Sequence, residues 1–216
     1  MELAIAIGLS YLLGSIPFGL LIAKSRGIDI RAVGSGNIGA TNVMREVGKS
    51  WGIITLILDA LKGLIAAIVL PTLAGYAGPD WLPLACGFTA ILGHSFPLYL
   101  KFKGGKGVAT SAGVLIGVAP AAFGVGIGVF AVLFALFRYV SLGSIAAAIV
   151  VPVASFLFER LKVEPDYFTT YVLVVLGVIV IWRHRANIRR LLAGTENRIG
   201  GARKQIEPSR DDAVEA

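Results

Sequence analysis

Charged residues are scarce in this chain of 216 residues, where Asp, Glu, Lys and Arg together make up 15% of the sequence. The single cysteine, Cys86, excludes an intramolecular disulfide bond and a cysteine-based metal cluster. A His-Glu-x-x-His zinc motif, a Gly-x-Ser-x-Gly nucleophile elbow and a clustered set of metal ligands are also missing. The sequence therefore offers no obvious protein nucleophile and no metal site.

Long apolar runs take the place of charge. The chain is 56% hydrophobic, and its mean hydropathy of +0.80 is too high for an ordinary soluble fold. Most runs are close to the roughly 20 residues that cross a bilayer as a helix. They cover residues 3–23, 51–75, 81–100, 108–137, 140–158 and 168–182. The sequence thus predicts an all-α polytopic membrane protein, with residues 1–200 as one domain and 201–216 as a disordered polar tail.

The 20 Lys and Arg residues outnumber the 13 Asp and Glu residues and fall in short blocks between the runs. Such blocks are typical of cytoplasmic loops, so we expect no nucleic acid partner. The first loop, the third connection and the tail from Arg183 are basic, which predicts an outside N-terminus and a cytoplasmic C-terminus. This orientation requires an odd number of spans. A break at Ala119 and Pro120 gives seven, and five spans with a re-entrant segment are the alternative.

Two connections combine glycine, basic residues and neutral hydrogen-bonding groups. The first loop contains Gly34, Ser35, Gly36, Asn37, Thr41, Asn42 and Arg45, and the third connection contains Lys103, Gly104, Gly105, Lys106, Gly107 and Thr110. Glycines let backbone amides approach an anion, and Arg and Lys supply positive charge. Each connection predicts a phosphate site, although a solvated loop and a positive-inside anchor are the simpler interpretations. The third connection is no Walker A loop, because Gly107 follows Lys106.

Three further places carry polar residues at the ends of spans or inside them. On a helix that continues the last span, His184 and Asn187 share a face and form a third polar contributor, whereas a basic helix lying on anionic lipid is the alternative. Asp59 and Lys62 are spaced i and i+3 and should pair inside the membrane. His94 falls inside the third run, where we expect it to form hydrogen bonds in the core.

These segments together resemble the bacterial acyl-phosphate-dependent glycerol-3-phosphate acyltransferases, the PlsY family. The resemblance covers most of the chain. It is carried by residues 14–19, 34–45, 58–63, 93–110 and 183–196, which include Gly-Ser-Ile-Pro-Phe-Gly, Phe-Lys-Gly-Gly-Lys-Gly-Val-Ala-Thr and Arg-His-Arg-Ala-Asn-Ile. The His-x4-Asp dyad of the soluble-type glycerolipid acyltransferases is absent, since Tyr99 and Arg189 stand five residues after the two histidines.

The resemblance implies transfer of a fatty acyl group from acyl phosphate to the 1-hydroxyl of sn-glycerol 3-phosphate, giving lysophosphatidic acid and phosphate for phospholipid biosynthesis. It implies a multi-pass protein of the bacterial inner membrane with a cytoplasmic active site, no metal or other cofactor, and a soluble enzyme that supplies acyl phosphate. The acyl phosphate itself would accept the hydroxyl proton, with His184 as an orienting hydrogen-bond donor. Neutral His184 as general base is the competing mechanism.

The resemblance also implies roles for individual residues. Ser35, Arg45 and the lysines of residues 103–107 would hold the phosphate groups, and the loop amides would stabilise the oxyanion. The pocket would be completed by Gly36, Asn37, Thr41, Asn42, Thr110, His184 and Asn187. Ser141 is a further candidate because of its expected cytoplasmic position, and Glu196 would anchor an arginine. A phosphate or organophosphate transporter and a purely structural membrane protein are the alternative functions.

Overall fold

The computed structural model describes residues 1–73, 79–162 and 167–200, and these residues form helices and connecting loops without a strand. The helices are α1 (Glu2–Ser15), α2 (Phe18–Ser25), α3 (Ala40–Glu46), α4 (Lys49–Leu73), α5 (Leu82–Ser95), the short 3-10 helix η1 (Leu98–Leu100), α6 (Val108–Val118), α7 (Pro120–Phe137), α8 (Val140–Arg160), α9 (Tyr167–Arg183) and α10 (Arg185–Leu192). The all-helical prediction is confirmed. The tail at 201–216 lies outside the described residues.

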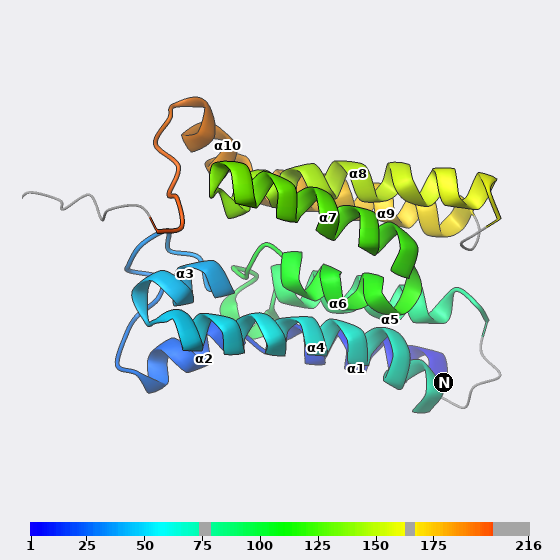
Figure 1. Cartoon of the computed structure of the whole chain (residues 1–216). Helices are drawn as coiled ribbons and strands as arrows, with labels where there is room; N and C mark the ends of the chain where they lie inside the picture. The colour runs from blue at the N-terminus through cyan, green and yellow to red at the C-terminus, as the bar shows by residue number, and fades with distance from the viewer. Residues whose placement is uncertain (74–78, 163–166, 201–216) are drawn as a thin grey trace, which may run out of the picture.

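The long helices form two layers (Figure 1). One layer holds α1, α4, α5 and α6, in which α1 packs on α5 and α4 packs on α6. The other layer holds α7, α8 and α9, with α8 between its two neighbours. The short helices α2, α3 and α10 lie together at one end of the bundle. Segments far apart in the sequence therefore meet at this end.

Proline sets two of the helix boundaries. The break predicted at Ala119 and Pro120 is present, and it turns the chain from α6 in one layer to α7 in the other. A second break at Ile16 and Pro17 separates α1 from α2. Proline lacks the backbone N–H that a continuous helix needs and disfavours helical geometry in the preceding residue.

The buried ion pair expected from the sequence supports the second break. Lys62 Nζ lies 2.8 Å from Asp59 Oδ1, and both side chains are buried. The same ammonium donates to the carbonyl oxygen of Ile16 at 2.8 Å. That carbonyl belongs to the interrupted helix, where backbone acceptors lose their helical donors. Lys62 thus satisfies both a carboxylate and an unwound backbone inside the bundle.

Four described helical stretches are long and apolar enough to cross a membrane: Glu2–Ser25, Lys49–Thr72, Pro120–Phe137 and Val140–Arg160. The α9 and α10 pair, bent by 58°, is a fifth candidate if it counts as one span. Helices α5 and α6 have 14 and 11 residues and are shorter than a full crossing. The seven-span topology, in which both would be short spans, stays a prediction.

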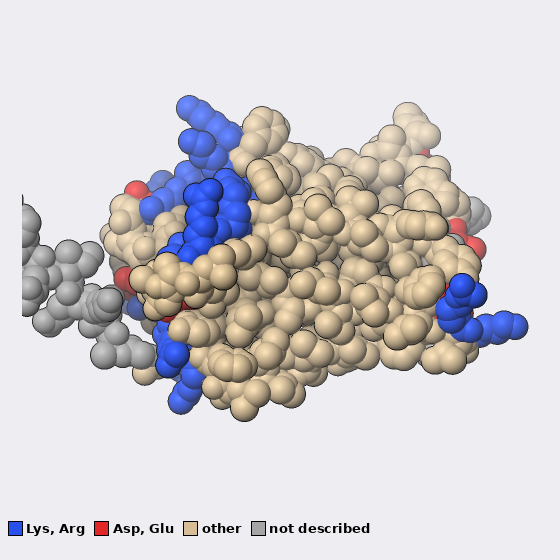
Figure 2. Space-filling view, turned by 90° about the horizontal axis from the view of Figure 1, so that it is seen from above, with Lys and Arg blue, Asp and Glu red and all other residues tan. Residues whose placement is uncertain are grey.

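The surface separates charge from apolar area. Lys and Arg gather mainly at the end where α2, α3 and α10 lie, with a smaller group at the opposite end (Figure 2). Between them the visible face is almost free of charge. Large apolar side chains of α7 and α9, such as Leu136, Tyr171 and Val178, are exposed. A soluble protein rarely exposes such an area, whereas a lipid-facing surface requires it.

Candidate active site

The predicted phosphate loops and the tail segment meet in one polar pocket at the basic end. The pocket is lined by Ser35, Asn37, Gly39, Ala40, Thr41, Asn42, Arg45, Leu56, Asp59, His94, Lys106, Gly107, Val108, Ala109, Phe130, Val140, Ser141, Ser144, His184, Asn187 and Glu196. Both layers of the bundle contribute to this lining. Residues more than 100 positions apart in the sequence therefore face the same space.

Asn42 shapes the first loop. Its side-chain Nδ2 donates to the carbonyl oxygens of Ile30 and Val33, each at 3.1 Å, and its Oδ1 accepts from the Ser35 amide at 2.9 Å. The side chain is fully buried. Gly34 and Gly36 both have positive φ values, which glycine adopts without strain. Because these contacts occupy the Asn42 amide, its main role in this structure is to position the loop, and Ser35 lies at the pocket.

Arg45 combines anion-binding capacity with a free donor. It stands on α3 and lines the pocket, and its Nη2 donates to the Asn197 carbonyl at 3.3 Å. Its Nε is buried and has no hydrogen-bond partner among the described residues. A buried guanidinium N–H without a partner is unfavourable, so an acceptor at this point would be bound strongly. An anion entering the pocket can supply that acceptor.

The glycine loop is held from two sides. The amides of Gly104 and Gly105 donate to the carbonyls of Ser95 and His94, at 3.2 and 3.0 Å. Arg183 in turn donates to the carbonyls of the same two glycines. The loop amides were expected to stabilise the oxyanion, but those of Gly104 and Gly105 donate to carbonyls at the end of α5 instead.

The first turn of α6 offers amides in their place. Helix α6 begins at Val108, and the first N–H groups of any helix have no partner within it. Gly107, Val108 and Ala109 all line the pocket. The helix dipole also favours an anion at this end. A phosphate or an oxyanion would thus meet the start of α6 rather than the two preceding glycines.

A hydrogen-bond chain joins the third connection to the tail segment. Lys106 Nζ donates to Asn187 Oδ1 at 2.6 Å, and Asn187 Nδ2 donates to Glu196 Oε1 at 2.7 Å. Glu196 also accepts from Ser141 Oγ at 2.8 Å and from Arg190 Nε at 2.7 Å. Arg190 is therefore the arginine that Glu196 anchors. Ser141, nominated only by its position, lies in the pocket as a partner of this carboxylate.

Burial shifts the pKa values of two groups in this hydrogen-bond network. Desolvation lowers the pKa of Lys106 to about 8. The negative charge of Glu196 opposes this shift, and the positive charges of Arg190 and Arg45 add to it. Burial raises the pKa of Glu196, but its three hydrogen bonds outweigh that effect, so the pKa lies below its ordinary value. At neutral pH the carboxylate is ionised and the ammonium is still charged.

His184 lies between α9 and α10 with its side chain in the pocket. Its Nδ1 is 2.8 Å from the carbonyl oxygen of Val180, which can only accept, so Nδ1 carries the proton. Burial and the positive charge of Lys106 lower the pKa of His184 to about 4. The neutral ring then leaves Nε2 as an acceptor. This tautomer does not match the expected donor role, because Nε2 can accept a hydrogen bond but cannot donate one.

His94 is a site residue that the sequence placed in the core. It stands in the last turn of α5, beside the basic loops, and its Nδ1 is 3.5 Å from Asp59 Oδ1. The ring packs against the backbone of Gly105, where an added Cβ would lie within 2.1 Å of Nε2. Pro97 was the signal that could have located it, because a helix usually ends before a proline. The helix formed by the third run therefore ends at Ser95, and His94 lines the pocket.

Some predicted residues lie elsewhere. Thr110 is fully buried, and its carbonyl would be only 2.2 Å from a Cβ placed on Gly63 of α4, so it packs between helices and does not line the polar pocket. Gly36, Lys103 and Gly104 line a neighbouring basic cavity. That cavity also holds the side chains of Arg31, Arg183, Arg185, Arg189 and Arg190. It shares Ser35, Asn37, Lys106 and Asn187 with the polar pocket.

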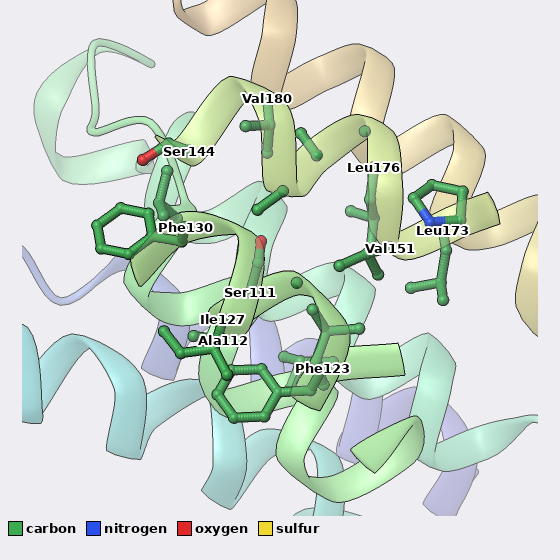
Figure 3. A pocket seen from close by; sticks show the side chains of 18 of the residues that line it. Ser111, Ala112, Phe123, Ile127, Phe130, Ser144, Val151, Leu173, Leu176 and Val180 are labelled. Carbon is green, nitrogen blue, oxygen red and sulfur yellow. The ribbon is translucent and has the colours of Figure 1, made fainter. Parts of the chain in front are cut away.

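An apolar pocket, shown in Figure 3, adjoins the polar pocket. It lies between α6 of one layer and α7, α8 and α9 of the other. Leu115, Phe123, Val151, Leu173 and Leu176 are among the side chains that line it. The two pockets share Val108, Phe130 and Ser144. Among the described residues, no three His, Cys, Asp or Glu side chains gather as metal ligands would.

An apolar helical bundle with a polar, cationic pocket at one end defines a multi-pass membrane protein with an anion site. Residues 4–194 match the sequence model of the glycerol-3-phosphate acyltransferases, and the chain belongs to this family. The glycerol-3-phosphate acyltransferases of Geobacter sulfurreducens and Geotalea daltonii are 50% and 46% identical to it. Their alignments cover 88% and 91% of this chain and 93% and 96% of theirs.

Solved structures agree with the family. Crystal structures of PlsY, an integral membrane glycerol 3-phosphate acyltransferase, are 42% identical, and each match covers 93% of this chain and 96% of that one. The TM-score is 0.82 for the glycerol 3-phosphate form and 0.79 for the lysophosphatidic acid form. This chain is therefore a membrane acyltransferase of the PlsY type, and the family favours this function over the transporter.

Proposed function

We propose that the protein transfers a fatty acyl group from acyl phosphate to the 1-hydroxyl of sn-glycerol 3-phosphate. One observation carries the proposal: the polar pocket shares lining residues both with an apolar pocket and with a basic cavity. The apolar pocket suits an alkyl chain, and the basic cavity suits a water-soluble dianion. The anhydride and the hydroxyl would then meet between them, beside Lys106 and the start of α6.

The reaction requires no protein nucleophile. The 1-hydroxyl oxygen bonds to the acyl carbon, and the bond from that carbon to the phosphate oxygen breaks. The hydroxyl proton passes to the acyl-phosphate group, so lysophosphatidic acid and inorganic phosphate leave. The first-turn amides of α6 and the Lys106 ammonium would stabilise the developing negative charge. His184 Nε2 would accept a hydrogen bond from the 2-hydroxyl of glycerol 3-phosphate, which holds the 1-hydroxyl in line and leaves its proton free for the acyl phosphate.

The basic end would face the cytoplasm of a bacterial inner membrane, as the positive-inside rule predicts. Glycerol 3-phosphate could then reach the site from the cytoplasm through the basic cavity. Acyl phosphate is an amphiphile, so we propose that a soluble enzyme delivers it at the same face. Exposed basic side chains around the cavity, such as Arg31 and Arg185, offer attraction for an acidic partner surface.

Purified protein in detergent, with a chelator present, tests the donor. Glycerol 3-phosphate is supplied with palmitoyl phosphate or with palmitoyl-CoA, and lysophosphatidic acid and phosphate are followed. We expect product from palmitoyl phosphate alone, with one phosphate released per acyl transfer. Product from the thioester alone would refute the proposed donor. Loss of product in chelator that returns on adding a divalent metal would refute the proposed metal independence.

A further inference from the structure

The apolar pocket contains two polar side chains, Ser111 and Ser144, among its lining residues. Ser144 Oγ donates to the Val140 carbonyl at 2.8 Å, one helical turn earlier. Ser111 Oγ is buried and has no hydrogen-bond partner among the described residues. Helical serines commonly donate to the carbonyl four residues earlier, as Ser144 does, but Ser111 makes no such bond. The Ser111 hydroxyl is therefore uncommitted in an otherwise apolar space.

The depth of Ser111 in the apolar pocket determines which carbons of a bound acyl chain its hydroxyl would face. Val108, Phe130 and Ser144 belong to both pockets and so mark the mouth of the apolar one. Ser111 follows Val108 by three residues on α6, which places it about 4.5 Å deeper at the rise of an α-helix. Figure 3 shows its oxygen directed into the space between the surrounding apolar side chains. It would lie level with the first carbons after the carbonyl of an acyl chain.

We propose that Ser111 is a specificity-determining residue that enables the pocket to accept acyl chains with a hydroxyl group near the carboxyl end, such as 3-hydroxyacyl chains. This inference rests on the proposed function. A serine hydroxyl can both donate and accept, so it matches a second hydroxyl. A chain hydroxyl that enters an apolar pocket loses its hydrogen bonds to water, and Ser111 restores one. A plain chain leaves the Ser111 hydroxyl without a partner.

The test compares palmitoyl phosphate with 3-hydroxypalmitoyl phosphate as competing donors. The ratio of kcat/KM for the hydroxylated donor over the plain donor is measured in the wild type, Ser111→Ala and Ser144→Ala. We expect the ratio to fall about tenfold in Ser111→Ala, the equivalent of about 1.4 kcal/mol, and to stay within about twofold in Ser144→Ala, whose hydroxyl is already committed. A ratio taken within one variant cancels any general loss of activity.

A donor with its hydroxyl at the far end, 16-hydroxypalmitoyl phosphate, controls for register. Its ratio to palmitoyl phosphate should not respond to Ser111→Ala, because its hydroxyl lies far from this residue. An unchanged ratio for the 3-hydroxy donor in Ser111→Ala, or an equal fall in Ser144→Ala, would overturn the inference while the acyltransferase proposal stands. Absence of product from palmitoyl phosphate in the wild type would instead defeat both.

Discussion

Lys106 is the residue on which the two halves of the site depend most directly. It belongs to the glycine loop, yet its ammonium donates to Asn187, which in turn donates to Glu196. The carboxylate thereby orients an amide, and the amide orients a cation. Such a chain fixes the position of the charge without neutralising it by direct contact. A phosphate group can therefore meet a positioned ammonium in the pocket.

The lowered pKa of Lys106 predicts a pH dependence of substrate binding. Below pH 8 the ammonium is charged, and as pH rises through about 8 it loses the charge that attracts a phosphate. We expect KM for the substrate that this lysine holds to rise up to about tenfold per pH unit above that point. In Lys106→Arg the guanidinium stays charged, so the rise should disappear. KM for both substrates on either side of pH 8 checks this, and a flat wild-type profile would contradict it.

His184→Gln separates the two mechanisms. A general base commonly contributes a factor of about 10² to 10⁴ to a rate. If His184 only orients the substrate, by accepting a hydrogen bond from its 2-hydroxyl, glutamine can partly replace that contact and kcat should fall by less than about 10². Single-turnover rates with saturating substrates measure the step directly. A larger fall, in protein that still binds glycerol 3-phosphate, would favour the general base.

Residue types indicated which segments form the site. They did not indicate which way a helical side chain points or at which residue a helix ends. Glycine and basic residues in two loops, and His184 with Asn187 on a tail helix, indicated the three segments that line the polar pocket. Thr110 belongs to the same motif as Val108, yet two residues on an α-helix turn the side chain about 200° away, toward α4. The amides of Gly104 and Gly105 are occupied because α5 ends at Ser95, beside them. Only the packed structure sets these relations.

At the scale of elements, close helix contacts depend on glycine. Gly113 of α6 faces the backbone of α4, where an added Cβ would lie 1.8 Å from the Ala60 carbonyl oxygen. Gly124 of α7 is exposed, and an added Cβ would have no heavy atom within 4 Å. The two glycines lie in adjacent apolar helices but differ in their surroundings. Small residues at helix crossings permit such approach in membrane bundles.

Gly113→Ala should therefore destabilise the fold, whereas Gly124→Ala should not. Overpacking of a tight contact costs about 1–3 kcal/mol, and the better helix propensity of alanine offsets at most about 1 kcal/mol of it. In Gly124→Ala only the propensity gain applies. The midpoint of thermal unfolding in one detergent compares the variants. A midpoint for Gly113→Ala equal to that of Gly124→Ala would contradict the tight α4 contact.

The elements themselves were largely predictable, because apolar length and proline are local signals. The apolar runs at 51–75, 140–158 and 168–182 begin and end within a few residues of α4, α8 and α9. The break at Pro120 appears as expected. The predicted end of the third span is wrong. Residues 96–100 are apolar except for the Tyr99 hydroxyl, but α5 ends at Ser95, before Pro97, and η1 lies in the following loop. Their hydropathy predicts that these residues belong to a membrane span, whereas the proline excludes them from the helix.

At the scale of the whole molecule, the arrangement of charge predicts orientation. Ser25, at the end of α2, lies at the basic end, and Asp80 precedes α5 at the opposite end. Both residues are exposed, and the native Cys86 is buried. In intact spheroplasts a membrane-impermeant maleimide should label Asp80→Cys and spare Ser25→Cys until the cells are lysed. The protein with Cys86 alone is the control, and the reverse pattern would refute a cytoplasmic site.

The apolar pocket lies between the two helical layers, and the Lys106–Asn187 hydrogen bond joins the loop before α6 of one layer to α10, which follows α9 of the other. A movement that widens this boundary to admit a chain also pulls on the bond that positions the ammonium. The alkyl part and the phosphate part of the substrates would then both bind at the boundary between the two layers. By thermodynamic linkage, occupancy of either part changes the affinity for the other by the same factor. If the layers separate to admit the acyl chain, we therefore expect the two substrates to bind with coupled affinities.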